Sequence, residues 1–340
     1  PGKGFIIDGN ANERIVINFS DFNNLNVPLH LMPNWYRSDV TVSNSSFSGI
    51  YSGEPAIIVR NADELITGKS STFRFVKNEF IGNMANIFIQ DYDSDIVKLI
   101  FKNNLITENY SEGLEVAGMY HAPFYTSFSG KGKRFTGEIN DNAIFNNYMM
   151  NADTVVQVIN VAVAGLGDKV DLTGNYFGYS DFKEATATID NFTNNVALPF
   201  AVIKPMSDAP SGLVGSHIWK IRMNGEDVNA FDPIPSISGT AADLALYFNA
   251  PVKKSAKPNM VYHYTGSNGE MLSSNMTVGN GSWNKNQVNY SLVGSELMSG
   301  DGYITISGFQ SENGQDVPMI TVGRIEADRK MVRMTPEIED

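Results

Sequence analysis

The stretch Phe101-Lys102-Asn103-Asn104-Leu105-Ile106-Thr107-Glu108-Asn109 decides the fold, because the first half of the chain repeats its pattern. The pattern has a polar marker (Asn104), an apolar residue two positions later (Ile106) and a second marker (Asn109). The aligned copies carry Ser20 and Phe22, Ser45 and Phe47, Asn78 and Phe80, Asn142 and Ile144, and Asn175 and Phe177. Successive first markers lie 25, 33, 26, 38 and 33 residues apart. Repeats at such spacings predict a solenoid in which each copy forms one coil.

A short β run precedes each marker, and a second β run follows it. The leading runs are 39–42, 72–75, 97–101, 135–139 and 169–172, and the following runs are 27–32, 56–59, 87–89, 114–116 and 155–163. Since Asn tolerates left-handed backbone and its amide bonds nearby backbone, we interpret each marker as a turn. If equivalent strands pair between coils, the markers form an internal ladder. The alternative is an antiparallel sandwich with Asn in its hairpins, but the two-residue turn signals typical of sandwiches are missing.

One segment carries a family resemblance. Gly174-Asn175-Tyr176-Phe177-Gly178, followed by Thr188-Ile189-Asp190-Asn191 and Val202-Ile203-Lys204-Pro205, resembles the closing coil of secreted bacterial proteins with a right-handed parallel β-helix of the pectate-lyase-like type. Phe177 departs from that pattern, which usually has Trp there. The resemblance covers residues 5–206 and implies the fold, but it implies no activity, because one fold hosts many functions.

The composition changes after residue 206. The turn-rich segment 207–212 predicts a linker, and alternating strands are expected at 217–223, 243–248, 261–264, 287–292, 302–308 and 321–326. Segments 244–258, 282–283 and 303–308 resemble bacterial immunoglobulin-like domains, which implies that Trp219 and Trp283 belong to a sandwich core. The sequence therefore predicts an all-β protein: a right-handed parallel β-helix (1–206), a linker (207–212) and an antiparallel immunoglobulin-like β-sandwich (213–340).

Charge and composition exclude some partners. A net charge of −12 argues against nucleic acid, whose phosphates need clustered Lys and Arg. The chain has no Cys, hence no disulfide and no thiolate metal site. It has no apolar run of about 18 residues, so no transmembrane segment is expected. Absence of Cys suits an exported bacterial protein, and because the chain starts at Pro1 we interpret it as a mature or trimmed fragment.

Acidic residues provide one candidate metal site. Asp91, Asp93 and Asp95 alternate along a β run, and three carboxylates on one face could hold calcium; no other cofactor is indicated. The alternative is a solvated acidic turn after Gln90. A second acidic group, Glu108, Glu112 and Glu115, is interpreted as solvating its coil.

Aromatic residues provide the candidate ligand-binding surface. Trp35 and Tyr36 follow Pro33 in a predicted loop, and Tyr120, His121 and Tyr125 lie in the longest predicted loop, 119–133. Sugars stack their C–H faces on flat rings, so exposed aromatics beside polar groups favour a glycan. The alternative is that these rings pack the loop onto the helix.

These observations favour an extracellular bacterial cell-surface protein, an adhesin-like scaffold that binds a polysaccharide or a host glycan. The enzymes of the β-helix family suggest an alternative, a polysaccharide lyase or glycoside hydrolase, with a base from Lys131, Lys133 or Arg134 near calcium bound at Asp91 to Asp95. Polygalacturonase-like signatures do not occur, and no catalytic residue is assigned. A third alternative is a structural segment of a large cell-wall protein.

Overall fold

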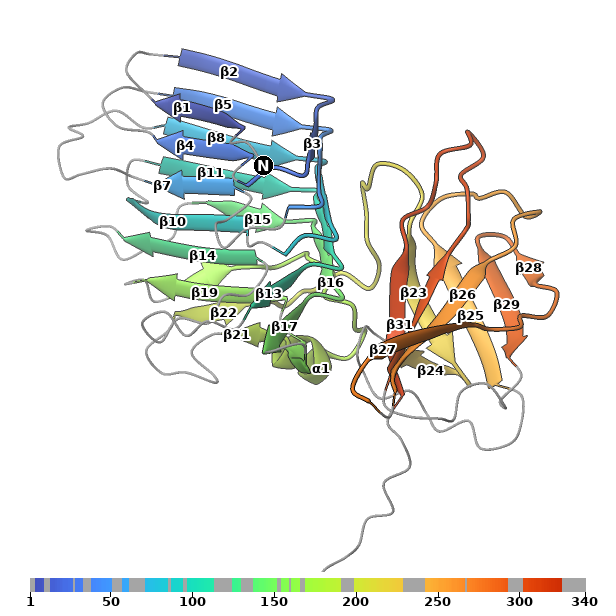
Figure 1. Cartoon of the computed structure of the whole chain (residues 1–340). Helices are drawn as coiled ribbons and strands as arrows, with labels where there is room; N and C mark the ends of the chain where they lie inside the picture. The colour runs from blue at the N-terminus through green and yellow to red at the C-terminus, as the bar shows by residue number, and fades with distance from the viewer. Residues whose placement is uncertain are drawn as a thin grey trace, which may run out of the picture.

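The computed structural model describes residues 4–8, 13–26, 28–32, 38–50, 57–60, 71–84, 87–93, 97–112, 124–129, 137–151, 154–158, 160–165, 169–190, 199–228, 242–266, 268–292 and 302–325. Strands dominate these residues, and the predicted all-β class is confirmed. Figure 1 shows a stack of parallel strands, blue to green, beside an antiparallel sandwich, yellow to red.

Three parallel sheets form the stack. Sheet A contains β1 (Phe5–Asp8), β4 (Leu29–Met32), β7 (Ile57–Arg60), β10 (Ile87–Asp93), β14 (Phe124–Ser129), β19 (Val161–Gly165) and β21 (Ile189–Asp190). Sheet B contains β2 (Glu13–Asn18), β5 (Ser38–Ser43), β8 (Ser71–Val76), β11 (Val97–Lys102) and β15 (Glu138–Asn140). Sheet C contains β3 (Asp21–Asn23), β6 (Ser46–Ser48), β9 (Glu79–Ile81), β12 (Leu105–Thr107) and β16 (Ala143–Phe145).

The chain visits sheets B, C and A in turn, as in β5, β6 and β7 and again in β8, β9 and β10, so each visit is one coil of a parallel β-helix. The predicted alignment of the repeats is confirmed by the register of sheet C. Phe22, Phe47, Phe80, Ile106 and Ile144 pair in succession. All five are buried in one apolar core, where Phe22, Phe47 and Phe80 stack their rings 4.6 Å apart.

The first markers form the predicted internal ladder. Asn104 is fully buried, and its Oδ1 accepts the Asn78 backbone N–H at 2.9 Å and the Asn78 Nδ2 at 3.1 Å. Its own Nδ2 donates to the Phe75 carbonyl and to Asn142 Oδ1. A parallel ladder runs through the second markers Asn83, Asn109 and Asn147. Burial of these amides is therefore matched by hydrogen bonds, as buried polar groups require.

The marker itself is not the left-handed residue, which corrects our interpretation of the turn. The positive φ angles fall one position earlier, at Asn44, Lys77, Asn103 and Asp141, with φ of 50°, 58°, 54° and 59°. The reason is geometric: the left-handed residue turns the backbone, and the next residue then points its side chain inward to the ladder.

The last coils carry the remaining elements. A small sheet contains β13 (Tyr110–Glu112), β17 (Tyr148–Asn151) and β18 (Thr154–Val158), and β20 (Lys169–Asp171) pairs with β22 (Phe200–Val202). Helix α1 (Phe182–Ala187) buries Ala185 in the core. Two predictions were wrong in part. The expected run 155–163 is divided between β18, antiparallel to β17, and β19. The predicted loop 119–133 contains β14, which pairs in parallel with β10 and β19.

The sandwich has two antiparallel sheets. The first has the order β24 (Glu226–Val228), β23 (Ile218–Met223), β25 (Ala242–Phe248), β29 (Gln287–Leu292) and β28 (Ser282–Asn284). The second has the order β27 (Met271–Asn275), β26 (Asn259–Thr265), β30 (Gly302–Ser307) and β31 (Ile320–Ile325). With β24 set aside, these are the A-B-E-D and C′-C-F-G orders of an immunoglobulin-like sandwich. Strands β24, β27 and β28 were not predicted.

The two tryptophans are half-buried. Trp283 stacks on Phe248 with ring centroids 6.0 Å apart, at the edge of the sandwich core. Trp219 instead meets Tyr176 of the β-helix edge-on at 5.6 Å. Trp219 also contacts Tyr247 of the sandwich at 6.2 Å and packs against the same apolar cluster as Trp283, so the expectation that it is a sandwich core residue holds only in part: its ring lies where the two domains meet.

Candidate functional site

Most of the residues predicted to bind a ligand or a metal are not among the residues that the structure describes. Trp35, Tyr36, Tyr120, His121 and Asp95 are outside the described residues, and only the backbone is described for Tyr125 in β14 and for Asp91 and Asp93 in β10. Elsewhere in the described part of the chain, no three His, Asp or Glu side chains gather closely enough to hold a metal ion. The calcium and glycan sites therefore stay predictions.

The buried ionisable side chains Glu108, Tyr176 and His217 lie at the contact between the outer face of sheet C and the sandwich, which we call the joint. In β3, β6 and β9 only the middle, inward residue is buried, but all three residues of β12 and β16 are buried. The outward residues Leu105, Ala143, Phe145 and Tyr176 belong to the same apolar cluster as the sandwich core. The sandwich therefore covers the side of the later coils, next to β16 in Figure 1.

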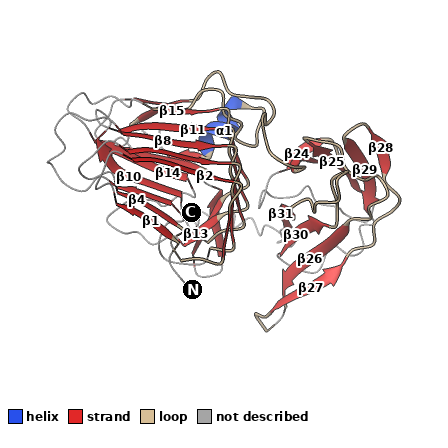
Figure 2. Cartoon of the chain, turned by 90° about the horizontal axis from the view of Figure 1, so that it is seen from above, coloured by secondary structure: helices blue, strands red, loops and turns tan. Residues whose placement is uncertain are grey.

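The segment 207–216 leads the chain back along the coils. The Ser207 N–H donates to the Asn175 carbonyl of the sixth coil. Gly212, with φ of +69°, lies so close to Asn103 of the fourth coil that a Cβ would sit 2.5 Å from its Oδ1. His217 reaches Glu79 of the third coil. This route explains why the sandwich stands beside the β-helix, as Figure 2 shows from above, and does not extend the stack.

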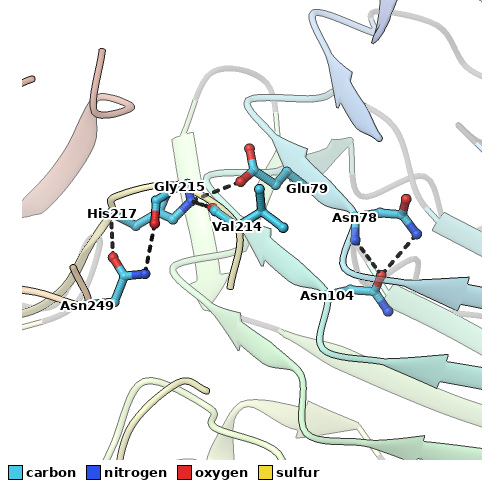
Figure 3. Close-up of polar contacts among 7 residues, drawn as sticks. All are labelled: Asn78, Glu79, Asn104, Val214, Gly215, His217 and Asn249. Atoms are coloured by element: carbon cyan, nitrogen blue, oxygen red, sulfur yellow. Dashed lines mark hydrogen bonds and ion pairs between the residues drawn. The ribbon is translucent and has the colours of Figure 1, made fainter. Parts of the chain in front are cut away.

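An ionisable pair fixes the upper end of the joint, drawn in Figure 3. The buried His217 has its Nε2 3.0 Å from Glu79 Oε1 and 2.7 Å from the Val214 carbonyl oxygen. Because both partners accept, Nε2 carries the proton. The His217 backbone N–H donates to Asn249 Oδ1 at 2.6 Å, and Asn249 Nδ2 donates to the Gly215 carbonyl at 3.1 Å, so Asn249 holds the backbone that carries the ring.

The centre of the joint is aromatic and has charges at its rim. The Tyr176 hydroxyl lies 3.2 Å from the carbonyl oxygens of Gly178 and Trp219, and burial raises the pKa of Tyr176, with a further contribution from Asp227. Partial burial opposes ionisation of Asp227, but the ammonium of Lys220 at 2.8 Å and the guanidinium of Arg222 at 2.6 Å outweigh it and lower the pKa of Asp227. The crevice beside these residues has no room for a small molecule.

Glu108 is the least expected residue at the joint. It has a left-handed backbone, with φ of 57°, in a turn where the other coils have Asn24, Gly49, Gly82 and Asn146. Such a backbone costs a residue with a Cβ about 1–2 kcal/mol. The carboxylate is buried and accepts the Thr321 N–H at 3.1 Å and the Thr321 hydroxyl at 2.7 Å.

These contacts change the chemistry of Glu108. Burial raises its pKa from 4.5 to about 7, and the hydrogen bonds from Thr321 and Asn146 only partly oppose this. Its expected role as a solvating residue is therefore wrong, because Thr321 on the edge strand β31 covers it. The joint as a whole can hold the two domains in one arrangement. In the sequence, it could have been found from the outward residues of sheet C, which change from polar to apolar along the coils.

Comparisons with protein-family models, curated proteins and solved structures found no match to this chain. Within the described residues, no helix has the length and apolar character needed to cross a membrane.

Proposed function

We propose that this chain is a rigid extracellular scaffold of a bacterial surface, an adhesin-like protein that presents a glycan-binding face on its β-helix. The observation that carries the proposal is the apolar cluster shared between Leu105, Phe145 and Tyr176 of the β-helix and the core of the sandwich. Domains joined by a linker move relative to each other unless their interface is large and hydrophobic. A joint with a common core suits a protein that must hold two modules in a fixed relation.

Interdomain distances measured by pulsed electron resonance test the rigidity. Because the chain has no Cys, Lys98→Cys and Ser273→Cys would be the only two thiols to label. Lys98 is exposed on the β-helix and Ser273 is exposed on β27. We expect one narrow distance distribution at about pH 6. Phe145→Asp, which places a charge in the shared cluster, is the control and should broaden it. A wild-type distribution as broad as that of the control would refute the rigid scaffold.

A binding and turnover screen tests the glycan part of the proposal. Acidic and neutral polysaccharides are offered with and without calcium. Binding that is weakened by Trp35→Ala or Tyr125→Ala, but not by Phe200→Ala at an exposed ring elsewhere, supports an adhesin. An unsaturated uronate product that disappears with Asp93→Ala would instead establish the lyase alternative. No binding and no turnover would leave only the structural segment of a cell-wall protein.

A further inference from the structure

Glu108 lies in a position that has no need of a carboxylate for the coil itself. The equivalent turns use Gly or Asn, residues that suit a left-handed backbone. Glu108 instead extends across the joint to Thr321 of β31. Strand β31 is the last strand of its sheet among the described strands, and the Thr321 N–H on its outer side donates to the Glu108 carboxylate in place of a strand partner.

Among the described residues, no cation lies close enough to Glu108 to compensate its charge. Thr321 and Asn146, which donate hydrogen bonds to it, are neutral, and no charged group of the described residues contributes to the pKa of Glu108. The other charged groups described at the joint are already paired: Lys220 and Arg222 with Asp227, and Glu79 with His217 when that ring is protonated. Within the described part of the chain, an ionised Glu108 is therefore a buried charge stabilised by neutral donors.

We propose that Glu108 makes the joint pH-sensitive, so that the sandwich docks tightly when this carboxyl is protonated and more weakly when it is ionised. A protonated Glu108 keeps both contacts, because its hydroxyl can donate to Thr321 Oγ1 while the other oxygen accepts the Thr321 N–H. Ionisation keeps the donors but buries a charge. The inference rests on the proposed scaffold and supplies its regulation.

The direction follows from linkage. The pKa of Glu108 is about 7 in the docked state, and it returns towards 4.5 when undocking exposes the carboxyl. Below pH 4.5 both states are protonated and docking is strongest. Between 4.5 and about 7 the docking constant falls as pH rises, and above 7 it is level again. The total change is about 2.5 orders of magnitude, because the pKa differs by about 2.5 units between the two states and each unit is a factor of ten.

Hydrogen exchange at the Thr321 amide measures docking directly, because this N–H bonds to Glu108 across the joint. Observed rates are divided by intrinsic rates at each pH, and the Leu246 amide, inside the sandwich on β25, reports global unfolding. We expect protection of Thr321 to fall about a hundredfold between about pH 5 and pH 8 in the wild type, with Leu246 little changed.

Two variants distinguish a titrating Glu108 from a merely structural one. Glu108→Gln keeps the shape but cannot ionise, so its protection should not vary with pH. Thr321→Val removes a hydrogen bond that lowers the pKa of Glu108. In this variant the fall of protection at the residue 321 amide should therefore occur at a higher pH than in the wild type. A flat wild-type profile with high protection would overturn the pH-sensitive joint but leave the rigid scaffold. Low protection at every pH would overturn both, and a slope retained in Glu108→Gln would assign the effect to another group.

Discussion

The substitution Asn104→Leu tests whether the internal ladder holds the β-helix together. Asn104 is fully buried, and its side chain takes part in four hydrogen bonds, two as acceptor and two as donor. Leucine fills nearly the same volume, so the change removes hydrogen bonds and leaves packing largely intact. The Asn78 backbone N–H and one Asn78 Nδ2 hydrogen lose their acceptor. The Phe75 carbonyl and Asn142 Oδ1 each lose one donor.

The expected loss is large for one residue. A buried polar group left without a partner costs about 1–3 kcal/mol. The two stranded donors of Asn78 dominate, because Asn142 Oδ1 still accepts the residue 104 backbone N–H. We therefore expect the free energy of unfolding to fall by about 3–5 kcal/mol, a substantial fraction of the roughly 5–15 kcal/mol of a typical domain.

Urea unfolding of the β-helix transition measures this loss, and two controls set the scale. Lys98→Ala removes an exposed ion pair with Glu138 and should cost less than about 1 kcal/mol. The double variant Asn78→Leu/Asn104→Leu removes both the Asn78 Nδ2 donor and the Asn104 Oδ1 acceptor of the same hydrogen bond. Its cost should therefore be clearly smaller than the sum of the two single substitutions. An Asn104→Leu variant no less stable than Lys98→Ala, or strict additivity, would refute the argument.

Three further predictions concern the joint and the acidic face. Gly212→Ala should destabilise docking more than Gly225→Ala, because both need positive φ but only the first would crowd Asn103; urea unfolding compares the two. Tyr176→Phe should weaken the protection of the Thr321 amide by a factor equivalent to about 1 kcal/mol, because the buried hydroxyl contacts the Trp219 carbonyl. If Asp91, Asp93 and Asp95 hold calcium, added calcium should raise the melting temperature, and Asp93→Ala should remove the increase; an unchanged melting temperature would argue for the acidic turn.

The β-helix could be predicted because its inward positions repeat. Each coil places one apolar residue, such as Phe80 or Ile106, in the middle of a three-residue strand, and an amide or hydroxyl two positions before it. Both features are local in sequence, so alignment alone recovers the register of sheet C. The left-handed position could not be located in the same way, because the template has two asparagines side by side, Asn103 and Asn104.

The joint could not be predicted from single coils, because the outward residues that form it become informative only when equivalent positions of successive coils are compared. Along sheet C, one outward column runs through Asp21, Ser46, Glu79, Leu105 and Ala143. It changes from polar to apolar where the sandwich begins to cover it, a signal that was present in the aligned repeats. That the covering element is the sandwich could not be predicted, since the route of 207–216 back along the coils depends on contacts far apart in sequence.

The substitution Glu108→Gly tests the opposing effects of Glu108 on stability, because the difference in unfolding free energy between the variant and the wild type should change sign with pH. Glycine relieves about 1 kcal/mol or more of left-handed strain, but leaves the buried Thr321 N–H unpaired, at about 1–3 kcal/mol. Below pH 4.5, where Glu108 is neutral in both states, the variant should therefore be equal to or less stable than the wild type. Above pH 7 the wild type additionally carries a buried ionised carboxylate, which costs roughly 3 kcal/mol for a pKa raised from 4.5 to about 7. There the variant should be the more stable protein. Unfolding curves at about pH 4.5 and about pH 8 would show the two stabilities change order; the same order at both would mean that Glu108 does not titrate in the joint.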